Sequence, residues 1–228
     1  MGTVSADGQV APQRGSELAL ETLRLGPGEA REIGDPGHDV LLFVFEGAGL
    51  LAGERVETGS AGFFLEGEQA VVEAGTEGAS FVRITLGDGT DLHAPMGGRE
   101  RIVPIAAVEP GTATGSRSFQ VLFGPHNGCN RATMFVGYVP PGKAPWHYHL
   151  YDEIVWIWRG PGRYYLGDDV EPLEDGSAFR ITPREVHIVE NTSPERELAI
   201  LGIFTPAGSP SAAYLPPDIA ASYVVSAS

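Results

Sequence analysis

Cysteine is nearly absent from this sequence: Cys129 is the single one among 228 residues, so the chain cannot form an internal disulfide. Because disulfides are typical of oxidising compartments, their exclusion favours a reducing one. The sequence also lacks the basic start and apolar core of a signal peptide, and it has no apolar run long enough to cross a membrane. We therefore expect a cytoplasmic protein.

Basic residues are few as well. Only 15 Lys and Arg stand against 30 Asp and Glu, which gives a formal net charge of −15 at pH 7. A negative surface of this size repels nucleic-acid phosphates and anionic lipids, and it keeps a protein in solution. We therefore expect neither nucleic acid nor a membrane as a partner, and we expect a small-molecule substrate.

Long helical patterns are missing too, since no long window places apolar residues at helical spacing. The 31 glycines and 18 prolines are spread along the chain and fit many short strands joined by tight turns. A hydrophobic content of 42% supports a buried core, and the length allows two domains of about 100 residues each. The composition predicts an all-β fold.

Histidine is scarce, yet three of the six histidines fall in one pattern, His147, His149 and His187. Glu153 follows the first pair and opens a strand-like run, residues 153–159. Side chains two residues apart share a face of an extended segment, so His147, His149 and Glu153 point the same way. Three neutral imidazoles and one carboxylate suit one divalent transition metal ion, such as Fe, Mn, Ni, Cu or Zn.

The same alternation sorts the aromatic residues near these ligands. Tyr151 shares the face of the ligands, whereas Trp156 and Trp158 fall on the opposite face. We therefore expect the two tryptophans to pack against another sheet, domain or subunit rather than to line the metal pocket.

Two motifs around the ligands resemble those of the cupins. The first, PPGKAPWHYHLYDEIVWIWRG, carries the paired histidines and Glu153 between Gly142 and Gly160. The second, GSAFRITPREVHIVEN, begins at Gly176, contains His187 and ends at Asn191. The resemblance implies a cupin fold and a metal site formed by the residues already singled out.

The motifs depart from the family pattern at their turns. Pro141 stands where the first motif has a glycine, and the second motif lacks its middle glycine. His187 comes four residues after Pro183, where the family has five. These departures concern the geometry of the turns and leave all four ligands in place.

An internal repeat extends the resemblance to the first half of the chain. Residues 40–53 resemble 153–167, and residues 59–61 resemble 176–178, as in duplicated β units. We therefore expect two tandem cupin-type, jelly-roll-like β-barrels. The positions that match the four ligands are Gly34, Pro36, Val40 and Ala70. The first barrel should thus have no metal site and serve packing or oligomerisation.

The repeat divides the chain into five parts. The predicted parts are an arm (1–16), a degenerate barrel (17–90), a connector (91–117), a metal-binding barrel (118–206) and a tail (207–228). Residues 102–108 of the connector are compatible with a strand or a helical turn. In many cupins such a tail covers the barrel or pairs with a partner subunit, and cupins commonly pair through sheet edges. The resemblance therefore implies a homodimer.

Three further residues are pocket candidates, each with an alternative role. Tyr151 could hydrogen-bond a substrate, or it could plug the barrel or lie in the loop before the strand. Asn191 could point inward or close the strand end, and Lys143 could meet an anionic substrate or be an exposed loop residue. Cys129 has no neighbour in sequence that suggests catalysis and is predicted to be a buried thiol. No site for an organic cofactor is expected.

Four protein ligands leave two positions of an octahedral metal open for a substrate and for dioxygen or water. We predict an oxidoreductase, a dioxygenase acting on a small aromatic or enol-type molecule, because apolar and aromatic residues surround the first motif. One alternative is a non-redox isomerase, decarboxylase or lyase that uses the metal as a Lewis acid. Another is a metal-bearing or ligand-binding protein without turnover. The cupins include all of these activities, so the resemblance leaves the three open.

Overall fold

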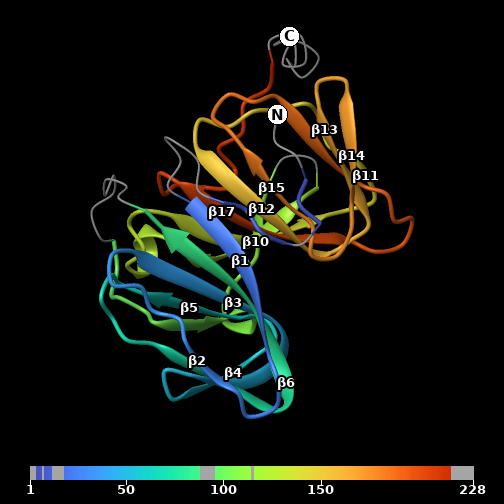
Figure 1. The fold of residues 1–228 in the computed structure, drawn as a ribbon. Coiled ribbons are helices and arrows are strands. Elements are labelled where there is room, and N and C mark those ends of the chain that lie inside the picture. The colour runs from blue at the N-terminus through green and yellow to red at the C-terminus, as the bar shows by residue number, and fades with distance from the viewer. Residues whose placement is uncertain (1–3, 7, 12–17, 88–95, 114–115, 217–228) are drawn as a thin grey trace.

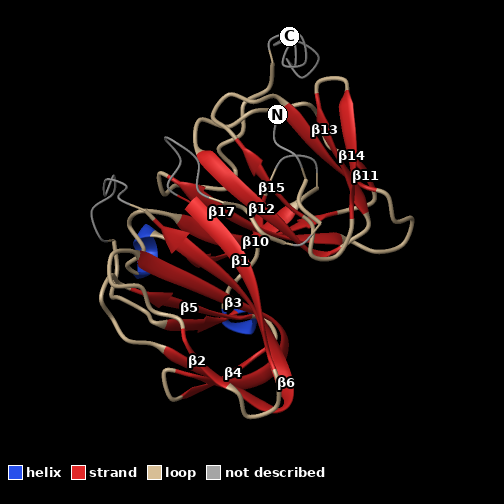
Figure 2. Ribbon diagram, viewed as in Figure 1, coloured by secondary structure: helices blue, strands red, loops and turns tan. Residues whose placement is uncertain are grey.

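The computed structural model describes residues 4–6, 8–11, 18–87, 96–113 and 116–216. Strands make up nearly all the regular structure of these residues, and the helical part is two short 3-10 turns (Figure 2). The turns are η1 (Ile105–Ala107) and η2 (Pro125–Asn127). The prediction of an all-β fold is confirmed. No helix in the described residues has the length and apolarity needed to cross a membrane.

The first half of the chain forms one antiparallel sheet of seven strands, in which β1-β6-β3-β5-β7 is the main path, β2 pairs with β6 and β4 pairs with β3. The strands are β1 (Leu18–Leu25), β2 (Ala30–Glu32), β3 (Asp39–Leu51), β4 (Glu54–Glu57), β5 (Ser60–Phe64), β6 (Val71–Leu86) and β7 (Ile102–Pro104). β3 and β6 are long, 13 and 16 residues, and they bend where their register shifts beside Gly47. Gly47 has a φ of 83°, and a Cβ there would lie 2.5 Å from the Gly78 carbonyl oxygen. The bend lets the sheet curl around an apolar core.

The second half forms two antiparallel sheets. Their strands are β8 (Gly111–Thr112), β9 (Ser118–Phe123), β10 (Thr133–Val139), β11 (Gly142–Lys143), β12 (Asp152–Arg159), β13 (Gly162–Leu166), β14 (Asp169–Leu173), β15 (Ala178–Ile181), β16 (His187–Asn191) and β17 (Leu198–Thr205). One sheet has the order β15-β12-β17-β10-β9-β8 and the other the order β11-β16-β13-β14. Apolar residues from both sheets, such as Val155 and Val189, form a core between them.

The two halves pack face to face through a large apolar cluster (Figure 1). Trp156 and Trp158 enter this cluster from β12. The Trp158 ring lies 5.0 Å from that of Phe43, at 88°, and its Nε1 donates a hydrogen bond of 3.2 Å to the Phe45 carbonyl. The prediction that both tryptophans pack against another sheet is confirmed. Cys129 is fully buried in the same cluster.

The segments outside the two predicted barrels also join the sheets. In the arm, Ser5 forms a β-bridge with Ala178 of the second half, and Val10 forms one with Leu20 of the first half. In the connector, β7 pairs with β5 and β8 pairs with β9, so the sheet of the first half and one sheet of the second half each gain a strand from it. The connector residues 102–108 contain both elements that the sequence allowed, a strand and then the turn η1.

The strand pairing of the two halves is the same at the positions that the sequence repeat matches. Glu153 pairs with Phe204 on one side and with residue 181 on the other. Val40 pairs in the same way with Thr85 and with residue 64. Val40 therefore occupies in the first half the ladder position that Glu153 occupies in the second.

Candidate metal centre

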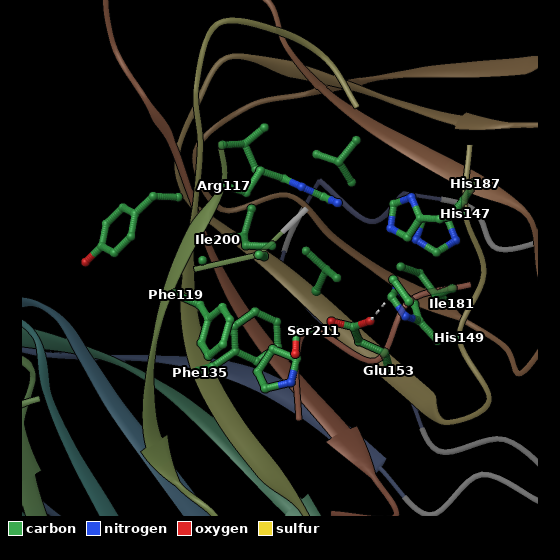
Figure 3. A pocket seen from close by; sticks show the side chains of 18 of the residues that line it. Arg117, Phe119, Phe135, His147, His149, Glu153, Ile181, His187, Ile200 and Ser211 are labelled. Carbon is green, nitrogen blue, oxygen red and sulfur yellow. Dashed lines mark ion pairs between the residues drawn. The ribbon is translucent and has the colours of Figure 1, made fainter. Parts of the chain in front are cut away.

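The three histidines of the predicted ligand set lie together in the second half (Figure 3). His147 and His187 form an isolated antiparallel bridge, in which the two backbone N–H···O bonds measure 3.2 and 2.9 Å. His149 follows two residues after His147 and comes from the same side. One ring nitrogen of each histidine lies within 4.8 Å of those of the other two, a spacing at which one metal ion can contact all three.

Hydrogen bonds fix the orientation of two of the rings. The Nδ1 of His147 lies 2.9 Å from the Pro145 carbonyl oxygen, and the Nδ1 of His187 lies 2.8 Å from the Glu185 carbonyl oxygen. Since a carbonyl only accepts, each Nδ1 carries the proton and each Nε2 keeps its lone pair for a metal. Backbone geometry thus selects the tautomer that a metal ligand requires.

Burial keeps all three imidazoles neutral. It lowers the pKa of His147, His149 and His187 to about 3, and the neighbouring histidines lower each of them further. A protonated imidazole cannot bind a metal, so these groups are ready to act as ligands across the neutral range.

Glu153 lies beside His149, outside the group of three histidines whose ligand atoms are within 4.8 Å of one another. Its carboxylate Oε2 lies 3.7 Å from His149 Nε2, and its side chain is buried at the start of β12. Burial raises the pKa of Glu153 to about 8, and the negative charge of Asp152 adds to this effect. A buried carboxylate is unfavourable without a cation beside it, and a divalent metal ion is such a cation. The burial and the neutral state of the three histidines fit a divalent transition metal ion, and Glu153 would have to lose its proton to join them.

The cluster opens into a pocket with mainly apolar walls. The apolar side chains come from the strands of both sheets and from residues beyond β17: Phe119, Phe135, Val139, Val155, Ile181, Val189, Ile200, Pro210 and Ala213. Such walls exclude water and strengthen the electrostatic interactions inside.

Arg117 brings a positive charge into this pocket. It precedes β9 by one residue and extends toward the histidines (Figure 3). Burial lowers the pKa of Arg117, whereas the Tyr151 and Glu153 side chains raise it. Sequence reasoning missed this residue, because it lies outside both motifs and inside the predicted connector. One feature of the sequence could have pointed to Arg117. Phe119, two residues later, faces the same side of an extended segment.

The other three pocket candidates are placed differently from one another. Tyr151 lines the pocket. Asn191 lies outside the pocket wall and closes a strand end, since its Nδ2 donates to the Val139 and Arg196 carbonyls at 2.8 and 2.6 Å. Lys143 is exposed, also outside the wall, and its Nζ lies 3.7 Å from the ring centre of Tyr165. Asn191 is held by backbone carbonyls and Lys143 by an aromatic face, so neither reaches the cavity.

The turn before His187 explains how the second motif tolerates its missing glycine. Arg184 has a φ of 69°, the left-handed conformation that a glycine adopts more easily. Its backbone N–H donates a hydrogen bond of 2.7 Å to the His149 carbonyl. The strained turn is therefore tied directly to the segment that carries the paired histidines.

The described part of the tail covers the pocket. Pro210, Ser211 and Ala213 contribute to its lining. Tyr214 forms a β-bridge with Tyr148, with both backbone hydrogen bonds at 2.9 Å, and the two rings stack at 5.4 Å. This is one of the two roles that the resemblance implied for the tail.

Comparison with known proteins supports the same fold. Residues 134–204 match the family described as "Cupin domain", and they contain His147, His149, Glu153 and His187. No curated protein is a significant match to the sequence.

Several solved structures resemble this chain. Oxalate decarboxylase from Bacillus subtilis is 17% identical, with a TM-score of 0.68 over 91% of this chain and 74% of that chain. A structure of the same enzyme, titled for its Mn(II) centres, is 16% identical, with a TM-score of 0.70 over 91% and 75%. The putative glyoxylate induced protein from Pseudomonas aeruginosa is 16% identical, with a TM-score of 0.69 over 82% and 74%. These likenesses confirm a cupin-type fold.

Proposed function

We propose that this protein is a metal-dependent enzyme that cleaves a small carboxylate substrate without redox chemistry, as a decarboxylase or a related lyase. The metal ligands would be His147, His149, Glu153 and His187. The observation that carries the proposal is Arg117, a cation that shares an apolar pocket with this ligand set.

Arg117 and the apolar walls of the pocket have different roles in this proposal. The guanidinium of Arg117 offers two parallel N–H donors, which match the two oxygens of a carboxylate. The apolar walls exclude water, so this pairing is stronger than it would be at the surface. A metal ion held by the four ligands would supply Lewis acidity. Pairing with Arg117 and contact with the apolar walls would orient a small molecule, which lowers the entropic part of the barrier.

The similar structures support a decarboxylase or lyase over a dioxygenase, because two of them are named oxalate decarboxylase. The pocket suggests a different substrate from oxalate. Phe119, Phe135 and Ile200 form apolar walls that an entirely polar dianion would contact without benefit. We therefore infer an acid with an apolar body, oriented by Arg117 and the metal.

Turnover assays on manganese-loaded protein test the proposal. A panel of small 2-oxo, 3-oxo and unsaturated acids with apolar bodies is supplied, and substrate loss, carbon dioxide release and oxygen consumption are followed together. We expect substrate loss without oxygen consumption. Arg117→Gln should lower kcat/KM by about 10- to 100-fold, the effect of a lost charged hydrogen bond, at unchanged metal content. The matched control is Arg163→Gln, at an exposed arginine outside the pocket.

Oxygen consumption coupled to substrate loss would instead support the dioxygenase predicted from the sequence. The aromatic walls formed by Phe119 and Phe135 favour that second candidate, because they suit a flat ring. Tight binding of a ligand without turnover would support a binding protein. Equal activity of the Arg117→Gln and Arg163→Gln proteins would contradict the carboxylate proposal.

We also infer the domain organisation and assembly from the sequence and the fold. Residues 17–90 would be a cupin barrel without a metal site, and residues 118–206 the metal-binding barrel. The same strand register at Val40 and Glu153 supports this division. The protein would act as a cytoplasmic homodimer, which light scattering coupled to size-exclusion chromatography tests directly.

A further inference from the structure

His149 is held differently from the other two histidines of the cluster. The Nδ1 atoms of His147 and His187 each have a backbone carbonyl as partner, whereas His149 Nδ1 is buried without a hydrogen-bond partner among the described residues. A hydrogen bond with the Ala212 backbone of the tail raises the pKa of His149 against the effect of burial, although Nδ1 itself has no well-aligned partner among the described residues. A second contact holds the plane of this ring more closely.

That contact is an aromatic stack. The His149 and Tyr151 rings lie 4.6 Å apart at an interplanar angle of 12°, and Tyr151 stacks in turn on Phe204 at 3.9 Å and 18°. The Tyr151 ring is therefore sandwiched between the imidazole and a fully buried phenyl ring. A ring clamped in this way cannot rotate without losing both contacts.

The sheet places this stack beside the ligands. Phe204 of β17 pairs directly with Glu153 of β12, and Tyr151 immediately precedes that strand. Phe204 also contacts Phe135 edge-on, with the ring centres 6.0 Å apart. Phe135 lines the pocket, so a run of aromatic contacts leads from His149 to the pocket wall.

We propose that Tyr151 is a positioning residue that holds the His149 imidazole in its metal-binding orientation through its ring. The proposal rests on the metal site of the proposed function. It assigns the role to the ring and not to the hydroxyl group, so the two parts of the side chain can be tested separately.

The experiment measures metal affinity rather than turnover. Cobalt(II) is bound to the full-length protein, its affinity is determined by competition with a chelator, and its absorption spectrum reports the ligand geometry. Tyr151→Phe keeps the stack and should bind cobalt within about twofold of the unmodified protein. Tyr151→Leu removes the stack and should weaken binding roughly 10- to 100-fold, the usual effect of losing a group that orients a ligand. Its spectrum should change as well.

Tyr164→Leu is the matched control. Tyr164 is an equally buried tyrosine with its ring 6.2 Å from that of His187, a ligand whose Nδ1 already has a carbonyl partner. This variant should lose thermal stability but keep its cobalt affinity within about threefold. Circular dichroism confirms that each variant is folded.

Several outcomes would overturn the proposal. Equal weakening by Tyr151→Leu and Tyr164→Leu would assign the effect to a looser core. Weakening by Tyr151→Phe as large as that by Tyr151→Leu would assign the role to the hydroxyl group. Full cobalt affinity in Tyr151→Leu would remove the role altogether. If the unmodified protein binds no cobalt, the metal site of the proposed function fails first.

Discussion

The two halves of the chain pair their strands in the same way at matching positions but carry different side chains there. In the second half, Phe135 and Gly202 face each other across β10 and β17. In the first half, the corresponding pair on β1 and β6 is Glu21 and Arg83. One half thus has a ring beside a glycine where the other has an ion pair.

The glycine keeps the second half open. A Cβ on Gly202 would lie 2.3 Å from the Phe135 ring and 3.0 Å from the Glu153 Oε1 atom. The matching residue of the first half, Arg83, donates hydrogen bonds of 2.9 Å to Glu21 and 3.1 Å to Thr85. At this position the first half thus carries a guanidinium group, whereas the second half carries a glycine beside Glu153.

The difference shows that the scaffold alone does not make the site. The side chains at a few matching positions differ between the two halves, while the strand pairing at these positions is the same. Substitutions made in one half at a time test this difference.

The largest effect is expected from removing a ligand. His187→Ala or Glu153→Ala should lose most of the bound metal and leave the fold largely intact, because each removes one of four donors. Metal content after manganese reconstitution is measured by elemental analysis. The control in the other half is His38→Ala, which should keep its metal because His38 pairs with Asp35, away from the cluster. Full metal in both ligand variants would refute the assignment.

A side chain at position 202 should close the second half. Gly202→Ala is expected to destabilise the protein by about 1–3 kcal/mol and to lower its metal content, because the added methyl group displaces Phe135 or Glu153. Urea unfolding and elemental analysis measure both effects. Gly98→Ala is the control, since a Cβ there has no atom within 4 Å. Indistinguishable behaviour of the two variants would contradict the steric argument.

Stability of the metal-free protein should depend on pH through groups of the second half. The histidine pKa values are about 3 in the folded state against 6.5, so stability falls as the pH is lowered from about 6.5 toward 3. The Glu153 pKa is about 8 against 4.5, so stability also falls as the pH rises from about 4.5 through 8. Three histidines act on the acid side and one glutamate on the alkaline side, so the free energy of unfolding should peak near pH 6.5.

Urea unfolding across this pH range measures the curve. His187→Ala should flatten its acid limb, because one buried neutral imidazole is gone, and Gly98→Ala should leave that limb unchanged. In the loaded protein, metal should be released on acidification through the histidine range. An acid limb of the same steepness in all three proteins would exclude the buried cluster as its source.

The smallest effect is expected in the first half. Arg83→Met removes the partner of Glu21 and Asp35, two partly exposed carboxylates, so we expect a loss of about 1–2 kcal/mol. Metal content should not change. A loss of metal would mean that the first half supports the site of the second more directly than the strand register suggests.

The motifs predicted that His147, His149 and His187 lie together, because alternation and motif spacing can be read from the sequence. Residues 153–159 were predicted as a strand for the same reason, and they form most of β12. Arg117 was missed because its place in the pocket depends on which strand β9 pairs with. The bridge of Ser5 to Ala178 was missed for the same reason, since it joins residues far apart in sequence.

The measurement that tests the account most directly is the metal content of protein purified with neither added metal nor chelator. We expect about one equivalent of a divalent transition metal per chain, because the ligand set is present in one half only. Absence of metal, even after reconstitution with manganese, iron, zinc and cobalt, would contradict the central claim.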